Sequence, residues 1–335
     1  MSTKYPGGFI TKSPVAPSQG IAPGIWTLDQ AMQLKKQGVW PPLVPGAPTI
    51  GTATQTGSTT ATVVFTAPAS NGGSVITSYT ATSSPAGGTG TLSQAGSGTI
   101  TVSGLAPSTS YTFTVTATNS VGTSAASAAS NSITAAALVI GQTYQGGFYA
   151  GQISTAGNSI ADYNLVVGPV ASAENASIKW KNSGGQTPGT DSVINGPQNT
   201  ADMVADGSST VYPAAHFCND LVIGGYSDWY MPAKNEMEVC YYNLKPTTQS
   251  NNTSSGINAN AVPARASNYT AGTPAQTSAT DFKVTGAEDF AVDCYWNSTE
   301  TGNSYAAASY FASGHQYSTV KYTSRRVRAV RRVAV

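Results

Sequence analysis

Thiol and imidazole groups, which could act as nucleophiles, bases or metal ligands, are scarce in this chain and lie only beyond residue 215. There are three cysteines, Cys218, Cys240 and Cys294, and two histidines, His216 and His315. The histidines are far apart in the sequence and have no acid or cysteine at a metal-ligand spacing. We therefore expect hydrogen-bonded surface histidines and no metal site. An odd number of cysteines favours free buried thiols, and one disulfide plus one thiol is the alternative.

Helices and strands must position these groups. Apolar residues at helical spacing predict one helix over residues 213–222 and a second that starts at Pro232, with Cys218 and Cys240 on their apolar faces. The polar stretch 247–280 is predicted to form an extended loop. Strands are predicted over residues 141–151, 163–172, 289–300 and 309–333.

Charged side chains are unusually rare. They make up 9% of the 335 residues, against about 25% in an average soluble chain. Residues 37–161 contain no Asp, Glu, Lys or Arg, and their apolar runs are well below the roughly 20 residues that span a bilayer. The N-terminus also lacks the apolar core of a signal peptide. We therefore expect a soluble, unprocessed protein without membrane insertion.

The balance of charge argues against nucleic-acid binding. The net charge is +1, and residues 162–335 carry twelve basic and fourteen acidic side chains. Neither this region nor the rest of the chain has the concentrated basic face that phosphate binding requires.

The length suits two or three domains. Residues 1–44 are rich in proline and glycine and cannot form a core of their own, but a capping pattern predicts a short helix over about residues 28–37. Large apolar side chains without a surrounding domain need a partner surface. We expect this arm to anchor the chain to another protein, and folding back onto the next domain is the alternative. The candidate anchor residues are Trp26, Leu28, Met32 and Trp40.

Residues 45–136 show a period of two. Ala61, Val63 and Phe65 alternate with threonines, and similar runs follow about every ten residues, between Gly, Pro and Asn turns. This pattern predicts an antiparallel β-sandwich. Because the segment has no His, Cys, acid or base, it has no groups for catalysis or metal binding. The roles that remain for this segment are those of a spacer or a weak surface binder.

Within this segment, the spacing of Leu105, Pro107 and Tyr111 resembles the fibronectin type III family, where these residues close the corner before the next-to-last strand. Residues 112–124 resemble that strand and the following loop. The tryptophan usual on the second strand is absent, and Phe65 stands near its place.

Four motifs follow one another in the last segment, at residues 214–221, 225–232, 295–300 and 328–331. Together they resemble the Lcl C-terminal-like module, which is related to the formylglycine-generating-enzyme type of C-type-lectin-like fold. The resemblance spans residues 140–333, and Tyr230, Met231 and Asn297 depart mildly from the family pattern.

The resemblance implies an α+β domain, and the physical setting of its motif residues favours a structural framework. Its residues are Asp228, Trp229, Trp296, Arg328 and Arg331, to which the sandwich adds Tyr111. We expect both arginines on the last strand, paired with Asp228, Glu236 or Glu300.

Three activities of the relatives have to be separated. An oxidase would need two reactive cysteines in a cleft, and a calcium-dependent lectin would need converging carboxylates that this chain lacks. We therefore expect no enzyme and no cofactor. Metal-free recognition through a surface hairpin, residues 303–317, remains. The candidate receptor-binding residues are Tyr305, Tyr310, His315 and Tyr317. The alternative is that these are ordinary strand residues without a role in binding.

The sequence G-I-W-T-L-x-Q at residues 24–30, with a later W-P, resembles the N-terminal segment of structural proteins of marine phages, especially those of cyanobacteria. It implies a mostly β, multidomain virion protein: an anchoring arm (1–44), a sandwich spacer (45–136) and a recognition head (137–335). Such a fibre, on the tail or the capsid surface, would be assembled in the host cytoplasm and exposed on the particle.

The expected partners are other virion proteins and a host-surface glycan or protein. A homo-oligomer is expected, with a trimer favoured, although no heptad repeat specifies one. The alternatives are a purely structural decoration or connector protein and a bacterial surface adhesin.

Overall fold

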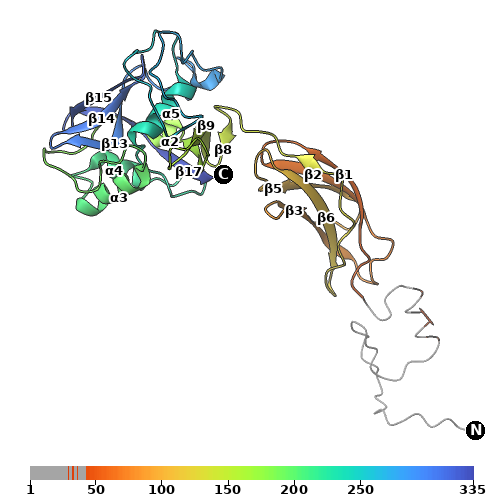
Figure 1. Cartoon of the computed structure of the whole chain (residues 1–335). Coiled ribbons are helices and arrows are strands. Elements are labelled where there is room, and N and C mark those ends of the chain that lie inside the picture. Colours follow the sequence, from red (N-terminus) through yellow and green to blue (C-terminus); the bar gives the residue numbers. More distant parts are fainter. Residues whose placement is uncertain (1–28, 30–31, 34–35, 37–42) are drawn as a thin grey trace, which may run out of the picture. The chain divides into compact units, whose positions relative to one another are not determined.

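The structure is a computed structural model that describes residues 43–335 together with positions 29, 32, 33 and 36. The chain divides into two compact units, Met1–Leu138 and Val139–Val335. Most of its regular structure is β, as predicted (Figure 1). No helix within these described residues is long and apolar enough to cross a membrane.

The predicted anchor is described only in part. Asp29, Met32, Gln33 and Lys36 are helical and exposed, within the predicted helix at 28–37. The other anchor candidates lie outside the described residues: Trp26, Leu28 and Trp40.

The first unit is a β-sandwich of seven strands in the order β1-β2-β5-β4-β3-β6-β7 (Figure 1). Alternate residues of β2, β5 and β6 are buried because successive side chains point to opposite faces. In β6 the buried apolar residues are Tyr111, Phe113, Val115 and Ala117, and Asn119 is buried as well. The strands are β1 (Thr49–Gln55), β2 (Thr60–Thr66), β3 (Ile76–Ser84), β4 (Thr89–Leu92), β5 (Gly98–Ser103), β6 (Ser110–Asn119) and β7 (Ile133–Thr134).

Two features of the family resemblance are visible in this core. The Tyr111 hydroxyl accepts a hydrogen bond from the Ala106 backbone N–H at 2.9 Å, which closes the corner before β6. Phe65 is buried, and its ring centroid lies 4.3 Å from that of Tyr79. Phe65 therefore fills the core without the usual tryptophan.

The edge of β6 is closed by a segment with a period of three, residues 124–130, which has the sequence Ser-Ala-Ala-Ser-Ala-Ala-Ser. Each serine donates its backbone N–H to a carbonyl of β6 and accepts the N–H of the same β6 residue on its side-chain oxygen. The three pairs are Ser124 with Ala117, Ser127 with Val115, and Ser130 with Phe113.

The second unit contains two five-stranded sheets and several short helices. One sheet has the order β12-β9-β10-β17, with β8 paired to β9, and the other has the order β11-β16-β13-β14-β15. Helix α5 packs against strands of both sheets. The strands are β8 (Thr143–Tyr144), β9 (Gly147–Ile153), β10 (Tyr163–Val167), β11 (Glu174–Lys179), β12 (Ala261–Val262), β13 (Cys294–Gly302), β14 (Tyr305–Tyr310), β15 (His315–Val320), β16 (Ser324–Arg328) and β17 (Val330–Ala334). The helices are α2 (Val170–Ala173), α3 (Gly196–Asp206), α4 (Pro213–Asn219), α5 (Lys234–Leu244) and the 3-10 helix η1 (Thr280–Phe282).

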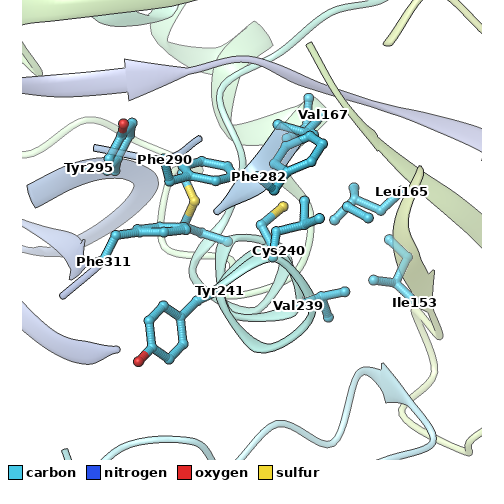
Figure 2. Close-up of a cluster of buried hydrophobic side chains, with 14 of the residues drawn as sticks. Ile153, Leu165, Val167, Val239, Cys240, Tyr241, Phe282, Phe290, Tyr295 and Phe311 are labelled. Atoms are coloured by element: carbon cyan, nitrogen blue, oxygen red, sulfur yellow. The ribbon is translucent and has the colours of Figure 1, made fainter. Parts of the chain in front are cut away.

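Aromatic rings dominate the core of the second unit (Figure 2). Phe290 and Phe311 stack with centroids 4.0 Å apart, and Tyr295 packs against both rings. Cys240 of α5 is fully buried in this cluster, as its predicted apolar face required.

The predicted helix boundaries need correction. Helix α4 ends at Asn219, three residues before the predicted end. Helix α5 begins at Lys234, not at Pro232, because Ala233 is extended and donates its backbone N–H to the Glu236 carboxylate at 2.8 Å. The loop at 247–280 is largely irregular, as predicted, and contains the short strand β12.

Candidate functional site

The β14–β15 hairpin gathers three of the four candidate recognition residues on one side of its sheet. The antiparallel register places Tyr310 opposite His315 and Ala308 opposite Tyr317. Since residues two apart share a face, Tyr310, His315 and Tyr317 lie together, and we call these three residues the hairpin face. Tyr305, five residues before Tyr310 in the same strand, belongs to the opposite face.

The side chains of the hairpin face are restrained by ring stacking and by partial burial. The rings of His315 and Tyr317 stack with centroids 5.3 Å apart and an interplanar angle of 28°. His315 is exposed, whereas Tyr310 and Tyr317 are half-buried. The face therefore combines a solvent-facing imidazole with two phenol rings whose positions the sheet restrains.

Strand β13 contributes neighbouring residues on the same side of the sheet. The Tyr317 hydroxyl donates a hydrogen bond to Cys294 Sγ at 2.7 Å. Burial raises the pKa of Tyr317, the Cys294 contact adds to this shift, and the positive charge of Arg325 opposes it. Trp296 lies opposite Ala308, is fully buried, and donates its indole N–H to the Ile178 carbonyl at 2.9 Å.

Arg325 of β16 adds a cation to this side of the sheet. Its neighbour Arg326 pairs with Tyr295, so Arg325 points to the side of Trp296. The Nη2 group of Arg325 lies 3.4 Å from Thr319 Oγ1, and its buried Nε has no hydrogen-bond partner among the described residues.

Arg325 differs from the other arginines because it has no carboxylate partner among the described residues. The remaining five arginines of the chain all pair with carboxylates: Arg265, Arg326, Arg328, Arg331 and Arg332. Sequence reasoning missed Arg325, because only the pairing of β16 with β13 brings it to the hairpin face.

The framework residues of the second unit form ion pairs and indole hydrogen bonds. Arg331 forms the expected bidentate pair with Asp228, with Nε–Oδ1 and Nη2–Oδ2 distances of 2.7 and 2.9 Å, and its guanidinium lies 3.9 Å from the Tyr226 ring centroid. Trp229 is buried and donates its indole N–H to the Tyr226 carbonyl at 3.1 Å.

The expectation for Arg328 was wrong in two respects. Arg328 lies on β16, not on the last strand, and its buried side chain pairs with Glu288 at 2.8 Å and with Glu174 at 3.8 Å. The other two predicted partners have different cations: Glu236 pairs with Arg332 at 2.9 Å, and Glu300 pairs with Lys321 at 2.6 Å. Arg328 enters the core because β16 runs inside its sheet, between β11 and β13.

The thiols and histidines have structural surroundings. All three cysteines are free and buried, and burial raises the pKa of Cys218 and Cys240 far above the usual range. His216 Nε2 lies 2.8 Å from the Gly207 carbonyl oxygen. Within the described part of the chain, no group of three or more His, Cys, Asp or Glu side chains is arranged to hold a metal ion.

These features define a β-rich protein with a sandwich and a second domain that presents ring-bearing side chains on a restrained sheet. Comparison with known families makes the description more specific. The fibronectin type III domain matches residues 46–133, and the Lcl C-terminal domain matches residues 172–331. Together the two matches indicate an adhesion or binding module.

Similar solved structures cover part of this chain. They include domains A168-A170 of titin, with 31% identity over 28% of this chain and 33% of the titin chain and a TM-score of 0.25. The FN5 domain of Drosophila Lar has 24% identity over 28% of this chain and 98% of the Lar chain, with a TM-score of 0.22. The FN1-FN3 domains of chicken CNTN1 have 21% identity over 37% of this chain and 41% of the CNTN1 chain, with a TM-score of 0.24. The chain thus corresponds to about a third of the length of the titin structure. No curated protein matches the chain.

Proposed function

We propose that this protein is a phage virion fibre, carried on the tail or the capsid surface, that recognises the host cell. Residues 1–44 dock on another virion protein, the sandwich acts as a spacer, and residues 139–335 form a C-type-lectin-like head that contacts a host-surface glycan or protein. The modular order of an arm, a fibronectin type III domain and an Lcl C-terminal domain supports this arrangement.

The observation that carries the proposal is the hairpin face. Tyrosine rings supply large contact areas at a low cost in conformational entropy. Here the cross-strand register brings two of them together with the His315 ring, and Arg325 adds a positive charge that pairs with no carboxylate among the described residues. Recognition through these side chains requires neither a metal ion nor covalent chemistry.

The hairpin offers a matched test. We expect the double variant His315→Ala/Tyr310→Ala to bind host cells at least about tenfold more weakly, the loss typical of central interface residues. Tyr305→Ala is the control, because Tyr305 is 48% exposed on the same hairpin but points to the opposite face. Binding of labelled protein to host cells is measured, with circular dichroism to verify folding. Equal binding by both variants and the intact chain would refute recognition by this face.

The virion location has its own tests. Particles whose protein ends near Ala136 are expected to adsorb poorly to host cells, and unchanged adsorption would exclude a receptor-binding head. A pull-down with residues 1–44 against capsid and tail fractions is expected to retain one of them, and retention of neither would reject the anchor.

Sedimentation of the intact chain tests the proposed homo-oligomer, for which we favour a trimer.

A second candidate is a structural decoration or connector protein without receptor binding. The sandwich favours it, since no charged residue occurs between positions 37 and 161 and the domain therefore offers no ionic groups to a ligand. This candidate predicts that the truncated particles adsorb normally but are less stable to heating.

A further inference from the structure

A second site of a different chemical kind lies in a cleft of about 350 Å³ in the second unit. It is formed by strand β10, the beginning of helix α3, the residues before α5, and strand β17. None of its residues belongs to the hairpin face. Its lining residues are Tyr163, Asn195, Pro197, Asp228, Tyr230 and Arg332. The volume is within the range of small-molecule sites.

The cleft contains polar groups that are not fully used in hydrogen bonds within the protein. The Tyr163 hydroxyl and the Asn195 side-chain NH₂ have no hydrogen-bond partner in the described part of the chain, whereas Asn195 Oδ1 accepts the Gln198 backbone N–H at 3.4 Å. Both Asp228 oxygens accept from Arg331, but the Asp228 side chain is 54% exposed and keeps further lone pairs open to solvent. The cleft thus contains donors and acceptors at fixed positions.

Ion pairs keep the walls rigid and electrically balanced. Arg332 donates to Glu236 at 2.9 Å and to the Ile194 carbonyl, and its guanidinium lies 5.2 Å from the Tyr163 ring centroid. Two carboxylates, Asp228 and Glu236, are therefore matched by two arginines, Arg331 and Arg332. A balanced site has little net attraction for an ion and suits a neutral polar ligand.

Two further clefts of this unit lack one part of this combination. The cleft of about 410 Å³ formed by residues 186–191 and 300–302 has no aromatic lining residue. In the cleft of about 300 Å³ near Tyr242, the polar groups of Arg265 and Tyr269 are already bound to Glu238.

We propose that the cleft at Tyr163 and Asn195 binds one ring of a neutral saccharide. A sugar ring has hydroxyls along its edge and C–H groups on its faces. The Asp228 carboxylate accepts from hydroxyls, the Asn195 amide and the Tyr163 hydroxyl donate to them, and Pro197 with the Tyr163 ring contacts the C–H groups. Because few groups are involved and the cleft is open on one side, single rings are expected to bind with dissociation constants on the order of millimolar.

The probes are three neutral glycosides: methyl α-D-mannopyranoside, methyl β-D-galactopyranoside and methyl α-D-glucopyranoside. Saturation-transfer-difference NMR on the full chain is expected to detect at least one of them, and glucuronic acid is expected to bind more weakly because its carboxylate meets Asp228. Absence of any neutral signal at tens of millimolar would overturn the proposal.

Two variants locate the site. Asn195→Ser keeps an N-capping side chain for α3 but removes the amide, and Tyr163→Phe removes only the hydroxyl. Each is expected to weaken the bound glycoside at least threefold, while Tyr305→Phe, which removes an exposed hydroxyl elsewhere, changes nothing. Unchanged affinity in both cleft variants would refute this location. The His315→Ala/Tyr310→Ala protein is expected to keep glycoside binding, so the outcome is independent of host recognition by the hairpin face.

Discussion

Both carboxylate oxygens of Glu238 accept hydrogen bonds from other side chains of the second unit. Glu238 is fully buried and accepts hydrogen bonds from Arg265 Nε at 3.1 Å, the Tyr269 hydroxyl at 2.6 Å and Asn258 Nδ2 at 2.5 Å. Asp228 has an equally close arginine, Arg331, but its side chain is 54% exposed. The two acids therefore depend on their cations to different degrees.

Glu238→Gln is expected to lower the free energy of unfolding by about 3 kcal/mol or more, because Arg265, whose side chain is only 14% exposed, is left without its counter-ion. Asp228→Asn is expected to cost only about 1 kcal/mol, since water replaces part of the lost interaction. Urea unfolding followed by tryptophan fluorescence compares the two variants. A similar loss in both would contradict the role assigned to burial.

The buried thiols predict a pH dependence. Burial raises the pKa of Cys218 and Cys240 above that of cysteine in the unfolded chain, about 8.5. Below that pH both states hold the two protons, and above it only the folded state does. The free energy of unfolding should then fall by roughly 1.4 kcal/mol per thiol for each pH unit.

This loss is measured by urea unfolding between about pH 8 and pH 9.5, before tyrosines ionise. The Cys218→Ala/Cys240→Ala protein is the control, and its free energy of unfolding should change much less over the same interval. A similar slope in both proteins would show that other groups cause the dependence.

Among the elements, the Ser-Ala-Ala segment replaces a regular edge strand of the sandwich. Every three residues of the segment cover two residues of β6, so every third residue, a serine, contacts the edge of β6. The pairs of alanines between the serines are exposed to solvent. Asn131, just after it, bonds through its side chain to both the N–H and the carbonyl of Ala53 in β1. Side chains thus satisfy edge groups that would otherwise be open to pairing with another strand.

Ser127→Ala is expected to destabilise the sandwich by about 1–2 kcal/mol, because the buried N–H of Val115 loses its acceptor at 2.9 Å. Ala128→Ser is the matched control at an exposed position and should change stability by less than about 0.5 kcal/mol. Thermal unfolding of both variants tests this, and equal effects would remove the side-chain hydrogen bond as the cause.

The elements with a strong apolar period were predictable from the sequence. Strands β2 and β6 follow the alternation of Ala61, Val63 and Phe65 and the run after Tyr111. The Ser-Ala-Ala segment was missed because its period is three. Helix α3 was missed because its buried face is mostly polar, as with Thr200, whose hydroxyl donates to the Gly196 carbonyl at 2.8 Å.

The candidate site was predictable only as a hairpin. Sequence placed Tyr305, Tyr310, His315 and Tyr317 in one segment, but the face that each occupies depends on the register, and a shift of one residue would exchange the faces. Arg325 and the Tyr163 cleft depend on pairings between segments far apart in the chain, which no local pattern encodes.

At the scale of the whole molecule, charge separates the two units. Ion pairs such as Glu238 with Arg265 stabilise the second unit, whereas the described residues of the first unit beyond Lys36 contain no charged side chain. The core of the sandwich is apolar, and its hydroxyl-rich strand faces meet the solvent. The two units should therefore respond differently to ionic strength.

Salt acts on charged groups by screening, so an uncharged sandwich has no ionic attraction to lose. We expect the unfolding temperature of isolated residues 45–138 to show only the general salting-out trend between low salt and the ionic strength of seawater. Residues 139–335 should depart from that trend, because partly exposed pairs such as Arg331 with Asp228 weaken as the screening length shortens. Calorimetry on both fragments, with sucrose as a non-ionic control for surface exclusion, separates the two effects. A sandwich that shifts as strongly as the second unit would show that its stability rests on interactions other than the apolar core and neutral hydrogen bonds described above.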